Sequence, residues 1–301
     1  MKMKPRLGSL LIIFVCGLVL PVPGCTRNTD KVAAERYLGP DKLYQTVEEN
    51  VRSHSKYEFI VDIDHSRLAA KAGSSMPPAH VIIWSDPELD AAILKHNPLA
   101  AIDLPLRVLA FEVNETGKAA VITNSYDYLA NRHALPDDQD IRTRYEAAIA
   151  QAMTGIPKDA IALFASDVMT DSGLVTLTSM HDFATTERRI LDAINAQSDT
   201  VSFGKIDFTD RSKEHGIDLE PIILILFGGP GPGGKAMASA PTLGLDAFCQ
   251  KLVIWQDASG TVHVTFNDLL ALAERQQVSV GIPLSVINRR LRETVSAAVE
   301  E

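Results

Sequence analysis

Asp64 and His65 form the adjacent polar pair in this chain that is best suited to chemistry. They follow residues 57–63, which are rich in strand-forming types, and functional side chains often gather where a strand ends. A carboxylate beside an imidazole can orient a general base or a metal ligand. The alternative is that Asp64 caps a short helix and His65 only flanks it. A related segment later in the chain has Asp207 followed by Phe208, which favours the capping interpretation.

Two further histidines, His80 and His96, could join His65 in a metal site. None of the three has a histidine counterpart in the related later segment, and the chain has no His-x-His, His-x₃-His or Cys-x₂-Cys spacing. Structural zinc sites normally show such spacings. We therefore expect neither a metal nor a cofactor. An enzymatic or metal site around Asp64, His65 and His80 is kept as the alternative hypothesis.

Residues 229–235, Gly-Pro-Gly-Pro-Gly-Gly-Lys, have the spacing of a phosphate-binding loop and follow a strand-like run. A phosphate cradle requires backbone N–H donors, which Pro230 and Pro232 lack. The residue after the lysine is Ala236, where such a loop needs a Ser or Thr to bind magnesium. Nucleotide binding is therefore disfavoured in spite of the spacing.

Two acids, Asp103 and Asp246, each lie just before a predicted strand, where acids are typically turn residues. Cys249 opens an apolar strand, which predicts a buried and inert thiol instead of a nucleophile. The chain has no Gly-x-Ser-x-Gly elbow, so we predict no catalytic residue and favour a non-catalytic protein over an enzyme. The candidate ligand-binding residues are Asp64, His65, His80, Asp103, Asp207 and Asp246.

The amino terminus has the layout of an export signal. Three cations in residues 1–6 precede an apolar run, 7–20, and then Val-Pro-Gly-Cys at 22–25. The run is shorter than the roughly 20 residues that a transmembrane helix needs, so cleavage is favoured over a permanent anchor. The last four residues resemble a bacterial lipobox, with Pro23 as an untypical choice. We predict a lipoprotein signal peptide at 1–24 and an acyl chain, such as palmitate, on Cys25.

Loss of the signal peptide removes three cations and no acids, which leaves 26 basic against 38 acidic residues and a net charge of −12. Attachment to a membrane would then rest on the acyl chains. Thr26 after the cysteine resembles outer-membrane lipoproteins of Gram-negative bacteria and predicts a periplasm-facing protein of the cell envelope. Residues 25–40 are polar and are interpreted as a tether. No basic run is interleaved with aromatics, so nucleic acid is not an expected partner.

The rest of the chain is an internal duplication. Segment 61–135 aligns with segment 204–278 at one constant shift and without a gap. The matching positions are mostly turn and polar residues: Gly73 and Gly216, Pro78 and Pro221, Pro87 and Pro230, Pro98 and Pro241, Asp103 and Asp246, Asn124 and Asn267, and Arg132 and Arg275. Because the period is the size of a domain, we predict one repeat at 41–155 and a second at 156–301.

The two copies predict the same order of elements. The first should contain a helix around 43–51, strands at 57–63 and 81–84, a hairpin from 106–113 and 119–123, and a helix at 141–153. The second should contain a strand at 174–178, a helix around 190–194, strands at 201–206, 222–227, 251–255 and 261–266, and a helix at 284–299. Helices that are segregated from consecutive antiparallel strands favour the α+β class.

Two stretches of the first copy, from Ile63 to Gly73 and from Asn97 to Leu106, resemble the domain of unknown function 302 family. The resemblance implies a compact, TATA-binding-protein-like fold with an antiparallel sheet and helices on one of its faces. Single-domain members of that family tend to pair, so tandem copies imply an internal pseudo-dimer. The family has no established activity, and the resemblance therefore implies the fold alone.

The copies depart from the family pattern in different places. Where the family tends to have Phe-Gly-Asn-Pro, the first copy has Trp-Ser-Asp-Pro at 84–87 and the second has Phe-Gly-Gly-Pro at 227–230. The first copy keeps Asp64-His65 and the second does not. If these segments build a site, neither copy carries it whole, and only a shared or residual site remains.

The leading hypothesis is a lipid-anchored envelope protein whose two copies form one body. The content of 46% hydrophobic and 22% charged residues is that of a globular protein. We expect this body to bind a small ligand or an envelope protein, with the groove between the copies as its site. A purely structural scaffold is the third possibility.

Overall fold

The computed structural model of the chain describes residues 26–114 and 117–300. The predicted signal peptide and the predicted acylation site at Cys25 lie outside the described residues. The first copy consists of α1 (Thr26–Ser53), β1 (Glu58–Asp64), α2 (His65–Lys71), β2 (Ala79–Ser85), α3 (Pro87–Leu94), the 3₁₀ helix η1 (Pro98–Ile102), β3 (Leu106–Val113), β4 (Lys118–Ile122), α4 (Tyr126–Arg132), α5 (Gln139–Ala152), η2 (Lys158–Ala160) and β5 (Ile161–Ala162).

The second copy repeats the order of elements from the first helix onward. It consists of β6 (Leu174–Thr178), α6 (Phe183–Asn195), β7 (Val201–Asp207), α7 (Phe208–Lys213), β8 (Ile222–Gly228), α8 (Pro230–Met237), η3 (Pro241–Gly244), β9 (Gln250–Gln256), β10 (Val262–Asn267), α9 (Leu269–Arg275) and α10 (Ile282–Glu300). Its fifth strand, β6, comes before its first helix, whereas β5 follows α5 in the first copy. From β1 and β7 onward, most elements are separated from their counterparts by the shift that the sequence predicts. The predicted α+β class with two repeats is confirmed.

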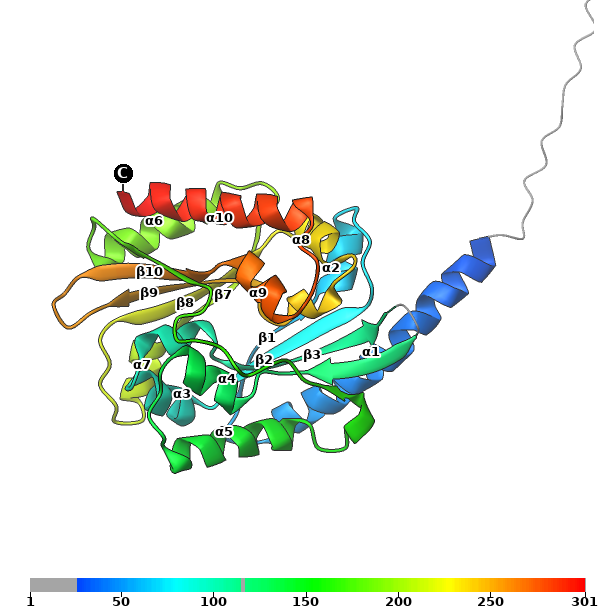
Figure 1. Cartoon of the computed structure of the whole chain (residues 1–301), viewed down its shortest axis with the longest axis horizontal. Helices are drawn as coiled ribbons and strands as arrows, with labels where there is room; N and C mark the ends of the chain where they lie inside the picture. The colour runs from blue at the N-terminus through cyan, green and yellow to red at the C-terminus, as the bar shows by residue number, and fades with distance from the viewer. Residues whose placement is uncertain (1–25, 115–116, 301) are drawn as a thin grey trace, which may run out of the picture.

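Each copy has one five-stranded sheet, with the orders β1-β2-β3-β4-β5 and β6-β10-β9-β8-β7. Only the short β4–β5 pairing is parallel. Helices α6 and α10 lie along one side of the molecule and α1 and α5 along the opposite side (Figure 1). On the inner side the copies exchange contacts, since η1 packs on β8, β9 and β10 while η3 packs on β2 and β3. Each sheet is therefore covered by its own helices on one face and by the other copy on the second.

The burial of β8 follows from this double cover. All seven of its residues are buried, and alternate side chains enter different cores. Ile223 and Ile225 pack beneath α6 and α10, whereas Leu224 and Leu226 join the core that continues into the first copy. A strand with two covered faces is apolar at nearly every position, which explains the run Ile-Ile-Leu-Ile-Leu-Phe at 222–227.

The sheet registers change the alignment of the copies in one place. Arg107 lies opposite Ile83 in the β2–β3 ladder, and Lys251 lies opposite Leu226 in the β8–β9 ladder. Ile83 and Leu226 are equivalent in the ungapped alignment, so their ladder partners Arg107 and Lys251 are equivalent too. The distance along the chain from Arg107 to Lys251 is one residue longer than the constant shift. The gap-free alignment expected from the sequence is therefore wrong over β3 and β9, where the second copy has one extra residue before the strand.

The boundary predicted at residue 40 between a tether and the first copy is not a break in the structure. Helix α1 runs from Thr26 to Ser53 with Pro40 inside it. Arg36 forms an ion pair with Glu112. A Cβ atom on Gly39 would lie 2.9 Å from the Cβ of Ala119. The helix is thus docked on the β3–β4 hairpin already before the predicted boundary. Within the described part of the chain, no helix has an apolar stretch long enough to cross a membrane.

Candidate functional site

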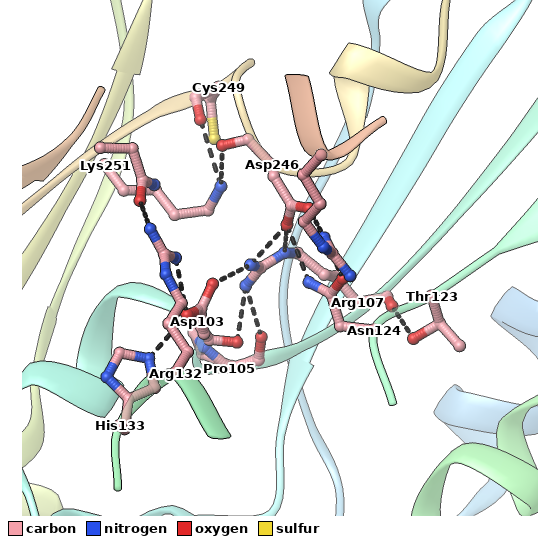
Figure 2. Close-up of polar contacts among 12 residues, drawn as sticks. Asp103, Pro105, Arg107, Thr123, Asn124, Arg132, His133, Asp246, Cys249 and Lys251 are labelled. Carbon is pink, nitrogen blue, oxygen red and sulfur yellow. Dashed lines mark hydrogen bonds and ion pairs between the residues drawn. The ribbon is translucent and has the colours of Figure 1, made fainter. Parts of the chain in front are cut away.

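The buried carboxylate of Asp103 lies among the side chains of Arg107, Arg132 and His133 (Figure 2). It accepts hydrogen bonds from Arg132 (Nη1–Oδ2, 2.8 Å), His133 (Nε2–Oδ2, 2.7 Å) and Arg107 (Nη2–Oδ1, 3.1 Å). Burial by itself would raise the pKa of Asp103, but Arg132, His133 and Arg107 together lower that pKa well below its usual value. Asp103 is therefore a charged, fully paired residue and not the simple turn residue that the sequence predicts.

Asp246 holds the equivalent place in the second copy. Its Oδ1 accepts hydrogen bonds from Arg107 (Nη2, 2.8 Å) and Asn124 (Nδ2, 2.9 Å), both from the first copy. Its Oδ2 lies 3.1 Å from Nη1 of Arg275. Burial opposes ionisation here too, and Arg107 and Arg275 lower the pKa of Asp246. Because Arg107 bonds to both aspartates, it joins the two copies directly.

Further bonds of these residues are symmetric: the first two cross between the copies, and the other two stay within one copy. Arg132 donates to Oδ1 of Asn267 (2.7 Å), and Arg275 donates to Oδ1 of Asn124 (2.9 Å). Lys251 donates to the carbonyl of Asp246 (2.9 Å), as Arg107 does to that of Asp103 (2.7 Å). We call this cluster the central network: Asp103, Arg107, Asn124, Arg132, His133, Asp246, Lys251, Asn267 and Arg275.

The central network has the properties of a structural link. Its members are buried, apart from the partly buried Arg275, and they hydrogen-bond mainly to one another. Burial and the neighbouring Arg107 lower the pKa of Lys251 to about 8, so this pKa lies not far above neutral pH. A catalytic group must reach a substrate, which a group buried among its partners does not do. Each charge of the network instead depends on its partners, because removing one of them leaves an uncompensated buried charge. The network therefore holds the copies together.

His65 also reaches across to the other copy. It is the first residue of α2, is 6% exposed, and its Nε2 lies 3.0 Å from the carbonyl oxygen of Gly244. Since a carbonyl only accepts, Nε2 carries the proton and Nδ1 carries the lone pair. Burial lowers the pKa of His65 to about 4, so the ring is neutral at neutral pH. The interpretation that His65 only flanks a helix is thus incomplete.

A small cavity of about 20 Å³ adjoins His65, at the contact between α2 and α8. One side comes from the first copy and the other from the second, and no charged side chain lines it. The lining residues are His65, Leu68, Phe203, Gly228, Gly229, Pro230, Gly233, Met237, Phe248 and Cys249. We call this space the inter-repeat cavity. It has room for about one water molecule or one ion.

The symmetry-related place between α3 and α7 has different chemistry. Phe208 stands at the position of His65, and Leu94 at that of Met237. In the sheet register Cys249 corresponds to Pro105. Gly233 corresponds to Asp90, whose buried Oδ2 accepts a hydrogen bond from Ser85 (2.5 Å). Burial raises the pKa of Asp90 to about 7.

Asp64 and His65 are neighbours in sequence that face different partners. Asp64 caps α2 by accepting from the backbone N–H of Arg67 (2.8 Å) and is paired with the Arg67 guanidinium. Asp207 caps α7 in the same manner, through the N–H of Asp210 (3.0 Å). The capping interpretation is confirmed for both acids.

His80 lies with Asp64 but away from the cavity that His65 lines. Its Nε2 is 3.0 Å from Asp62, and its ring stacks on Tyr44 at 3.5 Å. Ligand atoms of Asp41, Asp64 and His80 lie within 4.8 Å of one another, which is close enough to hold a cation. Arg67 already binds both carboxylates of that group, at 2.7 Å for Asp41. The structure thus separates the predicted His65–His80 pair.

Two open hollows lie at the rim of the interface between the copies. One, of about 360 Å³, is lined by residues including Pro77, Phe111 and Thr242. The other, of about 440 Å³, is lined by residues including Pro98, Glu220 and Trp255. They are formed by equivalent segments of the two copies. The expected groove between the copies is therefore filled at its centre by the central network, and these two hollows lie at its rim.

Sequence reasoning missed most of the central network, although part of the signal was present. Asn124 and Arg132 recur as Asn267 and Arg275 in the ungapped alignment, and buried polar residues that survive duplication point to a shared partner. Arg107 and Lys251 left no such signal, because the one-residue offset pairs Arg107 with Gln250. Met237 and Cys249 are apolar-looking residues that only the fold brings beside His65.

Comparison with known proteins identifies the family. A family model described as "Domain of unknown function DUF302" matches residues 32–152 and again 175–299. The chain therefore belongs to this family, in two copies, as the resemblance in its sequence predicts. A solved relative is the crystal structure of an uncharacterized conserved protein DUF302 from Bacillus stearothermophilus, at 16% identity and a TM-score of 0.36. That match covers 42% of this chain and 96% of the other.

Curated relatives are found in Brucella. The fluoride-specific ion channel FluC 1 of Brucella suis biovar 1 is 36% identical over 116 residues, which are 38% of this chain and 45% of that protein. FluC 2 of Brucella melitensis biotype 1 has the same identity over 116 residues, with 42% of its length covered. The chain thus spans less than half the length of the curated relatives it matches.

Proposed function

We propose that this tandem member of the DUF302 family is a non-catalytic ligand-binding protein of the cell envelope. An acyl chain on Cys25 anchors it, and the inter-repeat cavity beside His65 holds its ligand. The mature protein faces the periplasm from the outer membrane. The anchor is supported by the signal-like amino terminus and by the lipobox-like residues 22–25.

The observation that carries the proposal is the complementarity of the two copies at the inter-repeat cavity. The first copy contributes His65, and the second contributes the segment 228–233 and Met237. Each copy alone departs from the family pattern, but the retained segments of the two face one another across this contact. At the related contact the same positions carry Phe208 and Asp90, so the lining of the inter-repeat cavity is not repeated there.

The state of the polar residues supports binding over catalysis. Asp103 and Asp246 are buried and paired with arginine side chains, so neither is placed to take a proton from a substrate. Asp64 and Asp207 are occupied as helix caps. His65 is neutral and donates from Nε2, which leaves Nδ1 as an acceptor for a ligand.

Acylation is tested by expressing the full chain in a Gram-negative host with a palmitate analogue. We expect the label and membrane retention in the wild type and in Cys16→Ala, and loss of both in Cys25→Ala. Cys16 is the control because it is the other cysteine of the amino-terminal region and lies inside the apolar run 7–20, which ends before Cys25. An equal label in Cys25→Ala would overturn the anchor.

Ligand binding is tested by thermal unfolding of the full chain against a panel of inorganic ions. We expect at least one compound to raise the Tm of the wild type and of His54→Phe but not of His65→Phe. His54 is a partly exposed histidine that stacks on Tyr57 and does not line the inter-repeat cavity. If no compound separates His65→Phe from the wild type, the binding role is wrong.

A further inference from the structure

The inter-repeat cavity has an unusual lining for a space of its size. Three of its residues carry atoms that bind soft metal ions: the imidazole of His65, the thioether of Met237 and the thiol of Cys249. Each of the three is at most 6% exposed. The rest of the lining is apolar or glycine, and none of it is charged. The space of about 20 Å³ suits one ion and excludes an organic molecule.

The second ring nitrogen of His65 is in the correct state for a metal. Its Nε2–H is taken up by the carbonyl of Gly244 at 3.0 Å, and Nδ1 has no hydrogen-bond partner among residues 26–114 and 117–300. Metal-binding histidines commonly donate their other N–H to a carbonyl or carboxylate, which fixes the tautomer. Gly244 is required for this contact, because a Cβ at that position would lie 2.8 Å from Cδ2 of His65.

The surrounding charge selects the valence of the ion. The cavity offers one ionisable ligand, Cys249, and the ammonium group of Lys251 lies 3.4 Å from the carbonyl of the same cysteine. A monovalent cation on one thiolate gives a neutral set, which is tolerated in an apolar, buried place. A divalent ion would leave a net positive charge beside Lys251. Thiolate and thioether ligands favour soft ions such as Cu(I).

We propose that the inter-repeat cavity binds one soft monovalent cation of the Cu(I) class through His65, Met237 and Cys249. Binding replaces the thiol proton of Cys249, which passes to solvent, and forms a sulfur–metal bond without any change of oxidation state. This inference rests on the proposed function, since it names the class of ligand for the same cavity. The related contact between α3 and α7 has no such set, because Phe208, Leu94 and Pro105 stand at the three positions.

The test uses Ag(I), which has the charge and sulfur preference of Cu(I) and is stable in air. The full chain carries Cys16→Ser and Cys25→Ser, so that Cys249 is its one thiol. Native mass spectrometry should find one Ag(I) per chain with the loss of one proton. The affinity should rise about tenfold per pH unit while the thiol is protonated, a readout that a purely structural cysteine would not give.

Variants separate the ligands from the fold. Cys249→Ser and Met237→Leu should each weaken Ag(I) binding by at least about tenfold. Met180→Leu, an exposed methionine at 77%, is the matched control and should bind like the parent. Met237→Leu keeps the shape of the side chain, and its Tm reports whether it is folded.

Three results would overturn the inference: no Ag(I) bound, binding unchanged in both ligand variants, or equal binding of Zn(II) in competition. If the thermal panel finds a different ligand that depends on His65, the cation is wrong but the binding role stands. If neither experiment finds a ligand, both fail.

Discussion

The contact between α2 and α8 and the contact between α3 and α7 are built from equivalent helices but hold different side chains. At the first, His65 bonds to Gly244 and a small uncharged cavity remains. At the second, Phe208 fills the place of the imidazole, and Asp90 is buried where the first contact has a glycine. The central network between them is nearly symmetric. Duplication thus preserved the charges that join the copies, while the two flanking contacts diverged.

This difference suggests how a tandem chain can specialise. In a symmetric pair, a residue change affects both equivalent contacts at once. In a duplicated chain, the copies change independently, so one contact can be filled for stability while the other keeps an open space. The predictions below test whether the network is shared and whether the two contacts differ as described.

The largest effect is expected from the central network. Asp246→Asn removes the carboxylate that pairs with Arg275 and one of the two that pair with Arg107, and should lower the free energy of unfolding by about 3–5 kcal/mol. Asp103→Asn should cost a similar amount, because Arg132 and Arg107 depend on it in the same way. Urea unfolding monitored by circular dichroism measures both.

Asp207→Asn is the matched control for these two variants, since it also removes one negative charge. It keeps a side-chain cap on α7, so a loss of well under about 1 kcal/mol is expected. A small loss in Asp246→Asn, close to that of the control, would contradict the role of the network as the link between the copies.

The two flanking contacts should respond to pH in opposite directions. His65 has a folded pKa of about 4 against 6.5 unfolded, so between these values the unfolded chain binds the extra proton and stability rises with pH. Asp90 has a folded pKa of about 7 against 3.8 unfolded, so the native chain holds the extra proton and stability falls as pH rises. Each contribution is on the order of 3 kcal/mol.

Each single variant should therefore remove one of these two pH dependences of stability and leave the other. Relative to the wild type, Asp90→Asn should lose stability between pH 7 and pH 4.5, and His65→Phe should gain it. Urea unfolding at pH 7 and at pH 4.5 measures these changes. For each variant, the change in stability between the two pH values should differ from that of the wild type by about 2 kcal/mol. Differences of the same sign in the two variants would refute the assignment.

Close packing at the two contacts should cause a smaller difference in stability between matched variants. Gly234 in α8 corresponds to Ala91 in α3, and a Cβ on Gly234 would lie 2.5 Å from the Cβ of Ala69. Alanine normally stabilises a helix by about 1 kcal/mol over glycine, but this clash should reverse the sign. We expect Gly234→Ala to cost about 1–2 kcal/mol and to weaken Ag(I) binding.

Ala91→Gly is the control for that variant, because it changes the same methyl group at the equivalent place. It should cost about 1 kcal/mol and leave Ag(I) binding unchanged. If Gly234→Ala stabilises the protein, the α2–α8 contact is looser than described.

The smallest effect is expected at exposed ion pairs. In the first copy, Arg67 of α2 bonds to Asp41 of α1 and to Asp64 at the end of β1. In the second copy, Lys205 of β7 pairs with Glu187 of α6 at 2.6 Å. Arg67→Ala and Lys205→Ala should each cost about 1 kcal/mol or less, because exposed ion pairs contribute little. A loss of several kcal/mol in either variant would show a larger role for this face, measured by the same urea unfolding.

Several features could be predicted from particular residues. The repeated prolines and glycines, such as Pro87 with Pro230, placed equivalent turns at one constant shift, and α3 and α8 begin at those prolines. The strands around Ile82 and Leu224 were expected from their apolar runs. The helices α3 and α8 were missed, since the Gly-Pro-rich segment 229–235 has low helix propensity and forms a helix only under the cover of α2.

The candidate site was less predictable. The sequence suggests Asp64 and His65 as a pair, but a residue at a helix cap and its neighbour point in different directions. It indicates only turn residues at Asp103 and Asp246, because nothing in their local sequence shows that the other copy buries them.

The sequence by itself determined the duplication, the α+β class and the order of elements, because these depend on local periodicity and on turn residues that act within a few positions. Only the tertiary structure decided which residues meet. The equivalence of Arg107 with Lys251 rests on strand register, and the approach of Met237 and Cys249 to His65 rests on packing between segments from opposite halves of the chain. Such contacts depend on the geometry of the whole fold, which no short stretch of sequence determines.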